Sequence, residues 1–331
     1  MKKNIIALAI ASAIAAPVAF ADAPTVYGKI NVAIEDSEDN GTTTEDRDSR
    51  IGIKGSEDLG NGLKAVYKME FGADVGDSFG GLSGRNAYVG LAGGFGTVLM
   101  GRHDSPFKMS QVKDLFGDNT FTDMGKKQVT GGLGLGGKSG ELRLDNVVAY
   151  VSPSFSGVKL IAAAAGADVG EDAEIANAYS VALTYGSTKK GLYLAAAMDS
   201  ADEVITEAVE VNGFDQEWTH TRFGAQYTTG GLIVNGTYQN FDADVDNSDE
   251  GTNVQVGVAY AMGKFMPKAK YFSTDYETSS MDDGTGYAVG LDYKLGKKTT
   301  AYVEYVSSED MANADGEDDF TSASVGLIHK F

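Results

Sequence analysis

The stretch VYGKINVAIE, residues 26–35, decides the fold because its side chains alternate between apolar and polar character. Val26 and Ile34 fall on one face of an extended chain, and Lys29 and Glu35 fall on the other. A period of two is that of a β-strand, whose successive side chains point to opposite faces. We therefore expect a strand that separates an apolar environment from an aqueous one.

The same alternation returns along the rest of the chain, and no segment shows a helical period. About sixteen segments carry it, an even number that is typical of outer-membrane barrels. They are residues 26–35, 50–54, 63–71, 85–93, 97–105, 145–155, 158–168, 176–186, 191–202, 218–230, 232–244, 252–263, 264–277, 283–296, 297–310 and 318–331.

The connections between these segments alternate in length and in charge. Tight Gly-rich turns are expected at 59–62, 93–96, 229–231 and 296–298, and long acidic connections at 35–48, 168–174, 199–217, 242–250, 275–283 and 309–319. Short turns would then lie at one rim and long loops at the other, as in an outer-membrane barrel. A soluble β-sandwich gives no reason for such a segregation.

A sheet that crosses lipid has to close on itself, because hydrocarbon offers no partner for the polar groups of an open strand edge. Strands of about 9–11 residues suffice to cross the bilayer. About sixteen strands enclose an aqueous lumen, whereas about eight would be filled by their own side chains. The expected fold class is an all-β, transmembrane, antiparallel β-barrel of about sixteen strands.

The first residues predict export. Lys2 and Lys3 precede an apolar run over residues 5–20, which ends in the small-residue pattern Ala19-Phe20-Ala21. This is the layout of a secretory signal peptide with its cleavage site. We expect a signal peptide over residues 1–21 and a single barrel domain over residues 22–331.

The composition excludes several classes of function. The net charge of −20 makes nucleic acid a poor partner, because phosphate binding needs clustered Lys and Arg. The absence of cysteine removes thiolate chemistry and Cys-ligated metals. The three histidines, His103, His220 and His329, fall in or beside different strands and show no catalytic spacing. We expect no enzyme activity, no cofactor and no dedicated metal site.

Two motifs match known ligand-binding patterns only in part. Residues 132–139 fit the P-loop spacing, but no strand precedes them and no helix follows. Residues 242–246 resemble the start of a calcium loop, but Asn247 and Asn253 replace its essential Gly and Glu. We expect a flexible loop in the first case. In the second, the acidic loops could bind divalent cations loosely and bridge to anionic lipid headgroups.

One connection, from Pro106 to about Arg143, is roughly twice as long as the other long connections. Long ordered loops in compact folds are uncommon and usually functional. We expect this third long loop to fold into the lumen and narrow it, and the alternative is an unusually long surface loop. Its acidic residues Asp114, Asp118 and Asp123 are the candidates for the loop side of a constriction.

Aromatic residues near strand ends are expected to form two girdles at the depth of the lipid headgroups. The candidates are Tyr27, Phe71, Tyr150, Phe155, Tyr185, Phe223, Tyr227, Tyr260, Tyr293, Tyr302 and Phe331. The alternative, core residues of a soluble protein, is less favoured by the alternation.

Several ordered motifs resemble the general diffusion porins of Gram-negative bacteria over essentially the whole chain after residue 21. They are VYGK at 26–29, SRIGIKGSEDLG at 49–60, RNAYVGL at 85–91, GR at 101–102 with PF at 106–107, and GLIHKF at 326–331. The resemblance implies a homotrimer of sixteen-stranded barrels, each with its own pore. It also implies that Phe331 is an aromatic signal for barrel assembly.

The resemblance further implies a constriction where a basic wall faces the inward loop. Lys29, Arg50 and Arg85 match the basic cluster, and Lys54 and Arg102 match its neighbourhood. The loop residues Asp114 and Asp118 match the acidic side, although DLFGD at 114–118 departs from the Pro-Glu-Phe-Gly-Gly stretch of enteric members. A wall arginine of those members is missing around 149–152, and Arg143 is a candidate replacement.

The expected function is a water-filled outer-membrane channel for passive diffusion of small hydrophilic solutes and ions, with a weak preference for cations. A substrate-selective outer-membrane channel is the alternative, and a structural barrel with a plugged lumen is a third hypothesis. The expected partners are two further copies of the chain, outer-membrane lipid and lipopolysaccharide bridged by divalent cations, and the solutes.

Overall fold

The computed structural model describes residues 23–38, 41–76, 81–119, 121–124, 142–166, 178–201, 218–243, 250–277, 283–312 and 317–331. The expected signal peptide and the P-loop-like residues 132–139 lie outside the described residues, and so does most of the calcium-like stretch 242–246.

Seventeen strands and one short helix make up the described fold. The strands are β1 (Thr25–Ser37), β2 (Gly41–Asp46), β3 (Arg50–Gly60), β4 (Leu63–Ala73), β5 (Leu82–Gly93), β6 (Gly96–Asp104), β7 (Arg143–Val151), β8 (Val158–Ala165), β9 (Ala178–Gly186), β10 (Gly191–Ala201), β11 (Trp218–Thr229), β12 (Leu232–Ala243), β13 (Gly251–Tyr260), β14 (Phe265–Tyr276), β15 (Gly284–Lys294), β16 (Thr299–Ala312) and β17 (Glu317–Lys330). The helix is α2 (Pro106–Met109). No helix in the described part of the chain is both long enough and apolar enough to span a membrane.

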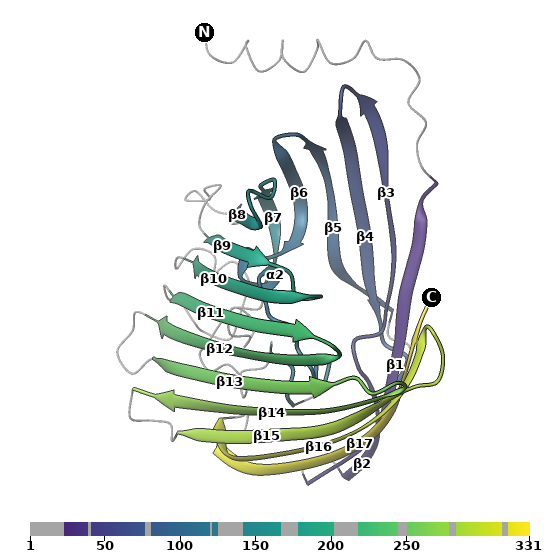
Figure 1. Ribbon diagram of the computed structural model, residues 1–331, viewed down its shortest axis with the longest axis vertical. Helices are drawn as coiled ribbons and strands as arrows, with labels where there is room; N and C mark the ends of the chain where they lie inside the picture. The colour runs from purple at the N-terminus through teal and green to yellow at the C-terminus, as the bar shows by residue number, and fades with distance from the viewer. Residues whose placement is uncertain are drawn as a thin grey trace.

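The strands form one closed antiparallel sheet (Figure 1). From β3 to β17 each strand pairs with the next in sequence. Closure comes from β1, which pairs with β17 in a register that runs from Lys29 opposite Lys330 to Ser37 opposite Ser322. The predicted all-β barrel is therefore confirmed.

The short strand β2 and the longer β3 together occupy one position in the barrel. Both pair with β1, β2 along residues 32–37 and β3 along residues 25–29. The interruption lies at residues 47–49, where Asp48 has a positive φ of 60° and the Arg47 N–H donates to the Asn31 carbonyl over 2.8 Å. Counted in this way, the barrel has the sixteen strands that the sequence predicts.

The acidic stretch 35–48 was predicted as a long loop, and this prediction is wrong. Most of it belongs to the β1–β2 hairpin, in which Glu35 lies opposite Thr43 and Ser37 opposite Gly41. The three consecutive threonines 42–44 favour extended backbone because they are β-branched. That preference outweighs the polar composition that suggested a loop.

The two faces of the sheet differ in character as the alternation predicts. On β1, Val26 and Ile34 are 58% and 55% exposed, whereas Asn31 and Glu35 on the other face are buried. Apolar residues are also exposed and polar residues buried on β17, where Val325 and Leu327 are exposed and Ser322 and Ser324 are buried. An apolar outer face and a polar inner face are what a barrel in lipid requires.

Two of the predicted girdle residues face the interior instead. Tyr27 donates a hydrogen bond from its hydroxyl to Glu70 (2.7 Å), and buried Tyr302 donates to Asn31 (2.9 Å). The physical reason is the alternation of side chains along a strand, which puts Tyr27 on the same inner face as Lys29. The Tyr27 ring lies against Gly52, where a Cβ atom would come within 2.6 Å of the ring, so this position has room only for glycine.

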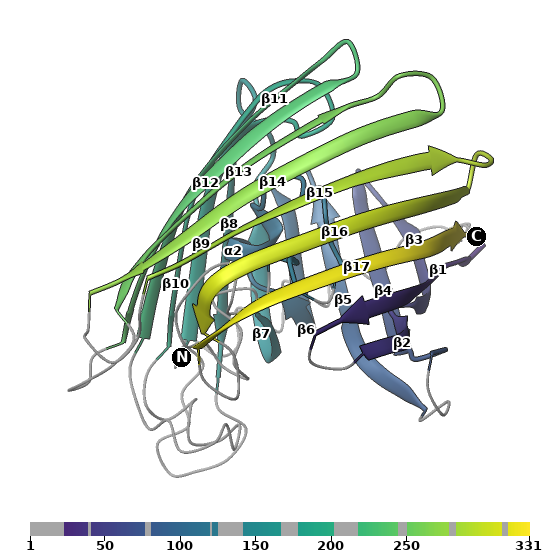
Figure 2. The same cartoon turned by 90° about the horizontal axis from the view of Figure 1, so that it is seen from below.

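The short turns between strands lie together at one end of the barrel. Figure 2 shows the turns after β11, β13 and β15 at the same end as the C-terminus. The turns 61–62 and 94–95 also belong to this short-turn rim. The tight Gly-rich turns predicted at 59–62, 93–96, 229–231 and 296–298 are confirmed.

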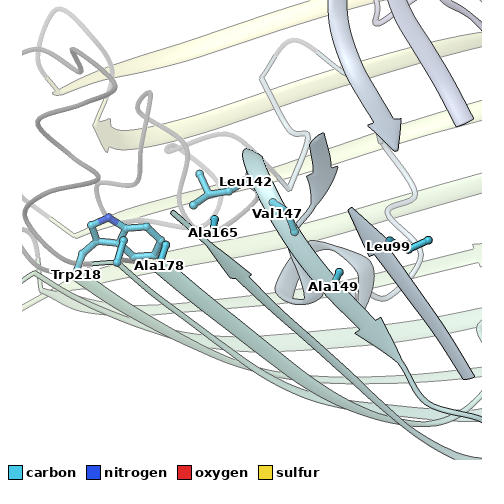
Figure 3. Packing of buried hydrophobic residues seen from close by; sticks show 8 residues of the cluster. Leu99, Leu142, Val147, Ala149, Ala165, Ala178 and Trp218 are labelled. Carbon is cyan, nitrogen blue, oxygen red and sulfur yellow. The ribbon is translucent and has the colours of Figure 1, made fainter. Parts of the chain in front are cut away.

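A cluster of buried apolar side chains lies on the polar face between β6 and β11. It comprises Leu99, Leu142, Val147, Ala149, Ala165, Ala178, Ala201 and Trp218. Figure 3 shows Trp218 beside Ala178, and Leu142 near Ala165. Four members are alanines, which leave room on the inner face for Leu142, the residue just before β7.

Candidate functional site

A large cavity lies between the inner face of β1–β7 and the segment that follows β6. Its volume is about 1260 Å³. Charged side chains dominate the lining, namely Lys29, Glu45, Asp46, Arg47, Asp48, Arg50, Lys68, Glu70, Asp74, Arg85, Asp104, Lys108, Asp114, Asp118, Asp123, Arg143 and Lys330. Because both signs occur in comparable number, such a cavity holds water and ions rather than an apolar ligand.

The three core members of the predicted basic wall all line this cavity. Lys29 on β1 forms an ion pair with Asp118 of the segment. Arg50 on β3 pairs with Asp48 (2.9 Å), and Arg85 on β5 pairs with Asp48 (2.7 Å). Arg85 also pairs with Glu70 on β4 (2.9 Å), so the three basic residues have three acidic partners, Asp48, Glu70 and Asp118.

Lys54 and Arg102, predicted in the neighbourhood of this cluster, are not among the residues that line the cavity. The Lys54 ammonium lies over the Tyr27 ring, 5.0 Å from its centroid. Arg102 forms an ion pair with the exposed Asp145 on β7. Lys54 lies four residues beyond Arg50 along β3, toward the short-turn rim, which removes it from the charged cluster.

The segment after β6, residues 105–124, starts with α2 and is fixed to the polar face of β9–β11. Ser105 caps the helix by accepting from the Lys108 N–H (3.2 Å), and its own hydroxyl donates to Asp199 (3.1 Å). Phe107 is fully buried, and its N–H donates to the Ser180 hydroxyl (3.0 Å). The Arg222 guanidinium lies over the Phe107 ring, 4.2 Å from its centroid.

The middle of this segment continues along the same wall, strand by strand. Tyr193 on β10 donates to the Ser110 carbonyl (2.8 Å). Gln226 on β11 accepts from the Lys113 N–H (2.8 Å), and Asn235 on β12 donates to the Lys113 carbonyl (2.7 Å). Residues 105–113 therefore run along the inner face of four successive strands, β9 to β12.

The end of the segment is held by buried charges on β14 and β16. Lys270 donates to the Thr122 carbonyl (2.7 Å) and lies 3.4 Å from Asp114. Asn119 donates from its amide to Glu304 (2.6 Å), which is 6% exposed in its side chain. Glu304 also pairs with Lys268 (2.8 Å) and with Arg47 (2.9 Å).

The three predicted acidic residues of the segment have different surroundings. Asp118 faces the basic wall, through its ion pair with Lys29 and a 4.0 Å approach to Arg50. Asp114 faces the opposite wall and accepts from the N–H groups of Phe116 (3.0 Å) and Met124 (2.8 Å). Asp123 accepts from the Asp118 N–H (2.7 Å).

Burial raises the pKa of the Asp118 carboxyl, and the neighbouring Lys29 charge opposes that shift. The charge state of Asp118 therefore depends on its ion pair with Lys29.

Several charged residues of the site were missed from the sequence, namely Arg47, Asp48, Lys68, Glu70, Lys268 and Glu304. The alternation of side chains along β14 could have identified Lys268, because Lys268 points to the same face of the strand as the buried Lys270. Arg47 gave no such signal, since it lies at the break between β2 and β3. Arg143, the candidate replacement for the missing wall arginine, lines the cavity and pairs with Asp104 (2.9 Å).

The acidic residues of the site do not form a metal centre. Within the described part of the chain, no three or more His, Cys, Asp or Glu side chains are grouped so that they could hold a metal ion.

Comparisons with known proteins agree with this architecture. The family model described as "Gram-negative porin" matches residues 7–313. The major outer membrane protein P.IB of Neisseria gonorrhoeae is 41% identical over 120 residues, which cover 33% of this chain and 34% of that protein. The P.IB protein of Neisseria lactamica is 35% identical over 169 residues, 47% of this chain and 48% of that protein. These matched parts span between a third and half of the relatives' length.

Solved structures share the fold over nearly their whole length. An anion-selective porin from Comamonas acidovorans has a TM-score of 0.78 at 22% identity, covering 93% of this chain and 99% of the other. The trimer form of OmpT from Vibrio cholerae has a TM-score of 0.69 at 20% identity, covering 94% and 100%. OmpF of Salmonella typhi has a TM-score of 0.71 at 14% identity, covering 93% and 97%.

Proposed function

Because the chain belongs to the Gram-negative porin family, we propose that it forms a water-filled outer-membrane channel for passive diffusion of small hydrophilic solutes and ions. The observation that carries this proposal is the cavity of about 1260 Å³, lined by opposed charges inside a closed sixteen-stranded barrel. A lumen of this kind needs no reaction, cofactor or energy source, because a concentration gradient drives the flow.

The segment 105–124 is proposed to be the loop that narrows the channel. Its support is the series of contacts with inward-facing residues, from Ser180 on β9 to Glu304 on β16. Held at both ends, it places Asp118 opposite the basic residues Lys29 and Arg50. The opposed charges set up a field across the constriction, so size and charge decide which solutes pass.

We propose a weak preference for cations. Isolated charges are screened within about 8 Å at physiological salt, which limits the basic wall to a local effect. The acidic residues of the long connections act together at one mouth and raise the local cation concentration. The fold is also compatible with the opposite preference, because the structurally similar porin from Comamonas acidovorans is anion-selective.

Reversal potential across a KCl gradient in a planar bilayer tests both statements. We expect open channels with a cation preference that increases as ionic strength falls, and a stronger preference in Arg50→Ala. An anion preference would show that the basic wall dominates. A steady current that a single solute blocks would favour the substrate-selective channel, and the absence of current would contradict the proposal.

Three further properties are proposed from the family. The chain is exported with residues 1–21 removed, and the intact mass of the membrane-extracted protein tests this. It assembles as a homotrimer, expected as an SDS-resistant and heat-modifiable species. Phe331 supports assembly, so Phe331→Ala is expected to slow the appearance of that species.

Lipopolysaccharide is proposed as a partner of the acidic loops, bridged by divalent cations. Chelation with EDTA is expected to release bound lipopolysaccharide from the purified trimer. Retention after chelation would argue against cation bridging.

A further inference from the structure

Two neighbouring turns at the short-turn rim carry an unbalanced positive charge. The turns connect β13 to β14 and β15 to β16, and residues 260–265 and 293–298 contain four lysines and no acidic residue. Lys264, Lys297 and Lys298 lie on the turns themselves and are exposed. These two turns therefore differ in sign from the long acidic stretches of the sequence.

The two turns are in direct contact. The Lys294 N–H donates to the Lys264 carbonyl over 2.8 Å, and Phe265 lies opposite Tyr293 in the β14–β15 register. The rings of Phe265 and Tyr293 pack with their centroids 4.8 Å apart. The lysines thus lie on two adjacent turns, and Figure 2 shows the turn that joins β15 to β16 at the end of the barrel where the C-terminus lies.

The ammonium group of Lys264 is directed to the outer face. It lies over the Tyr293 ring, 5.7 Å from the centroid, and Tyr293 shares the outer face with the exposed Phe265. Lys294, by strand alternation, points to the inner face, and Lys330 lines the lumen cavity. Only Lys264, Lys297 and Lys298 are therefore assigned to the outward patch.

Exposed apolar side chains surround these lysines. Met262, Phe265 and Leu295 are 50%, 49% and 53% exposed. Apolar and aromatic side chains next to lysine ammonium groups are the arrangement found at the boundary between acyl chains and headgroups. The apolar side chains can enter the acyl region while the ammonium groups remain at headgroup depth.

We propose that Lys264, Lys297 and Lys298, with Phe265 and Tyr293, form a binding site for the phosphate-bearing headgroup of an anionic phospholipid. The lipid belongs to the leaflet that surrounds the short turns, which in an outer-membrane barrel faces the periplasm. Basic clusters at this depth bind anionic headgroups with a contribution from each lysine. The inference rests on the proposed barrel in the outer membrane but not on its conductance or selectivity.

The test measures binding of phosphatidylglycerol to the purified trimer in a zwitterionic detergent by native mass spectrometry. For Lys264→Ser/Lys297→Ser/Lys298→Ser we expect binding that is about tenfold weaker or more. Phosphatidylcholine should bind wild type and variant equally. The matched control, Lys159→Ser/Lys189→Ser/Lys190→Ser, removes the same charge near the β7–β8 and β9–β10 turns. It should weaken binding less than the patch variant, because Lys159 alternates with the exposed Val158 and Leu160 and therefore points to the inner face.

Three results would overturn the site. They are unchanged binding in the patch variant, an equal loss in the control variant, and displacement of the lipid by inorganic phosphate at equal concentration. If the triple variant does not assemble, Lys297→Ser/Lys298→Ser replaces it, because this variant keeps the contact between Lys264 and Tyr293. Planar-bilayer conductance of the same proteins separates the two proposals, since lost lipid binding with normal current refutes only the lipid site.

Discussion

The charged residues on the two sides of the segment 105–124 face different surroundings, although their residue types are the same. On the β1–β5 side, Arg50 and its partner Asp48 retain 28% and 42% side-chain exposure beside the cavity. On the β14–β16 side, Lys268 and Glu304 retain 5% and 6%. The first wall presents charge to the lumen, and the second uses charge to hold the segment in place.

This difference teaches that the solvent around an ion pair decides its role. Exposed pairs contribute little to stability because water and salt screen them. Removing one partner of a buried pair leaves an uncompensated charge and is strongly destabilising. We therefore expect substitutions on the β14–β16 side to change stability, and substitutions on the β1–β5 side to change ion selectivity.

The largest effect is expected from Glu304→Gln. This change removes the negative charge shared by Lys268, Arg47 and Asn119 and is expected to cost roughly 3 kcal/mol of unfolding free energy. Urea unfolding of the trimer in lipid vesicles measures it. Asp145→Asn is the matched control, because it removes a carboxylate from an exposed pair, and it should cost at most about 1 kcal/mol. Equal losses in the two variants would contradict the comparison.

A smaller stability effect is expected from Asp114→Asn. The carboxylate accepts from the Phe116 and Met124 N–H groups and lies near Lys270, and an amide keeps only part of this acceptance. The expected loss is about 1 kcal/mol, measured by the same unfolding experiment. Asp114 also lines the cavity, but its side chain is 9% exposed and lies beside Lys270, so ion selectivity should change less than in Asp118→Asn.

Asp118→Asn should change selectivity, and its loss of stability should be smaller than that of Glu304→Gln, because the Asp118 side chain is 26% exposed although its partner Lys29 is buried. The substitution leaves Lys29 and Arg50 without their partner on the segment, so the reversal potential should shift toward anions. A permeability ratio about two- to threefold lower is expected, since one screened charge is removed.

Acidification provides a second test of Asp118. Because burial raises its pKa, lowering the pH should move wild type toward the selectivity of Asp118→Asn, and the variant should respond less. An identical pH response in the two proteins would show that other carboxylates control the selectivity.

The smallest effect is expected from Arg102→Ala. Arg102 pairs with exposed Asp145 and is not among the residues that line the cavity. Stability should change by less than about 1 kcal/mol, and the reversal potential should remain unchanged. A clear shift in selectivity would place Arg102 in the conduction path and would extend the functional wall to β6.

The sequence by itself determined the barrel, because a two-residue period is a local property that lipid outside and water inside impose on every strand. It also placed Lys29, Arg50 and Arg85 on the wet face and the Gly-rich turns at one rim. The errors of the sequence analysis were also local. The threonine-rich strand β2 was predicted as a loop, and Tyr27 was predicted at the lipid surface although the alternation along its strand places it on the inner face.

Only the tertiary structure decided which charges remain free to act on passing ions and which are buried. Asp114 and Asp118 look alike in sequence, but one contacts Lys270 and the other contacts Lys29, on opposite walls. Asn119 and Glu304 are 185 residues apart and meet because folding brings β16 beside the segment that follows β6. No local period encodes such contacts, since they depend on the distance and the water between two walls that the chain brings together only on folding.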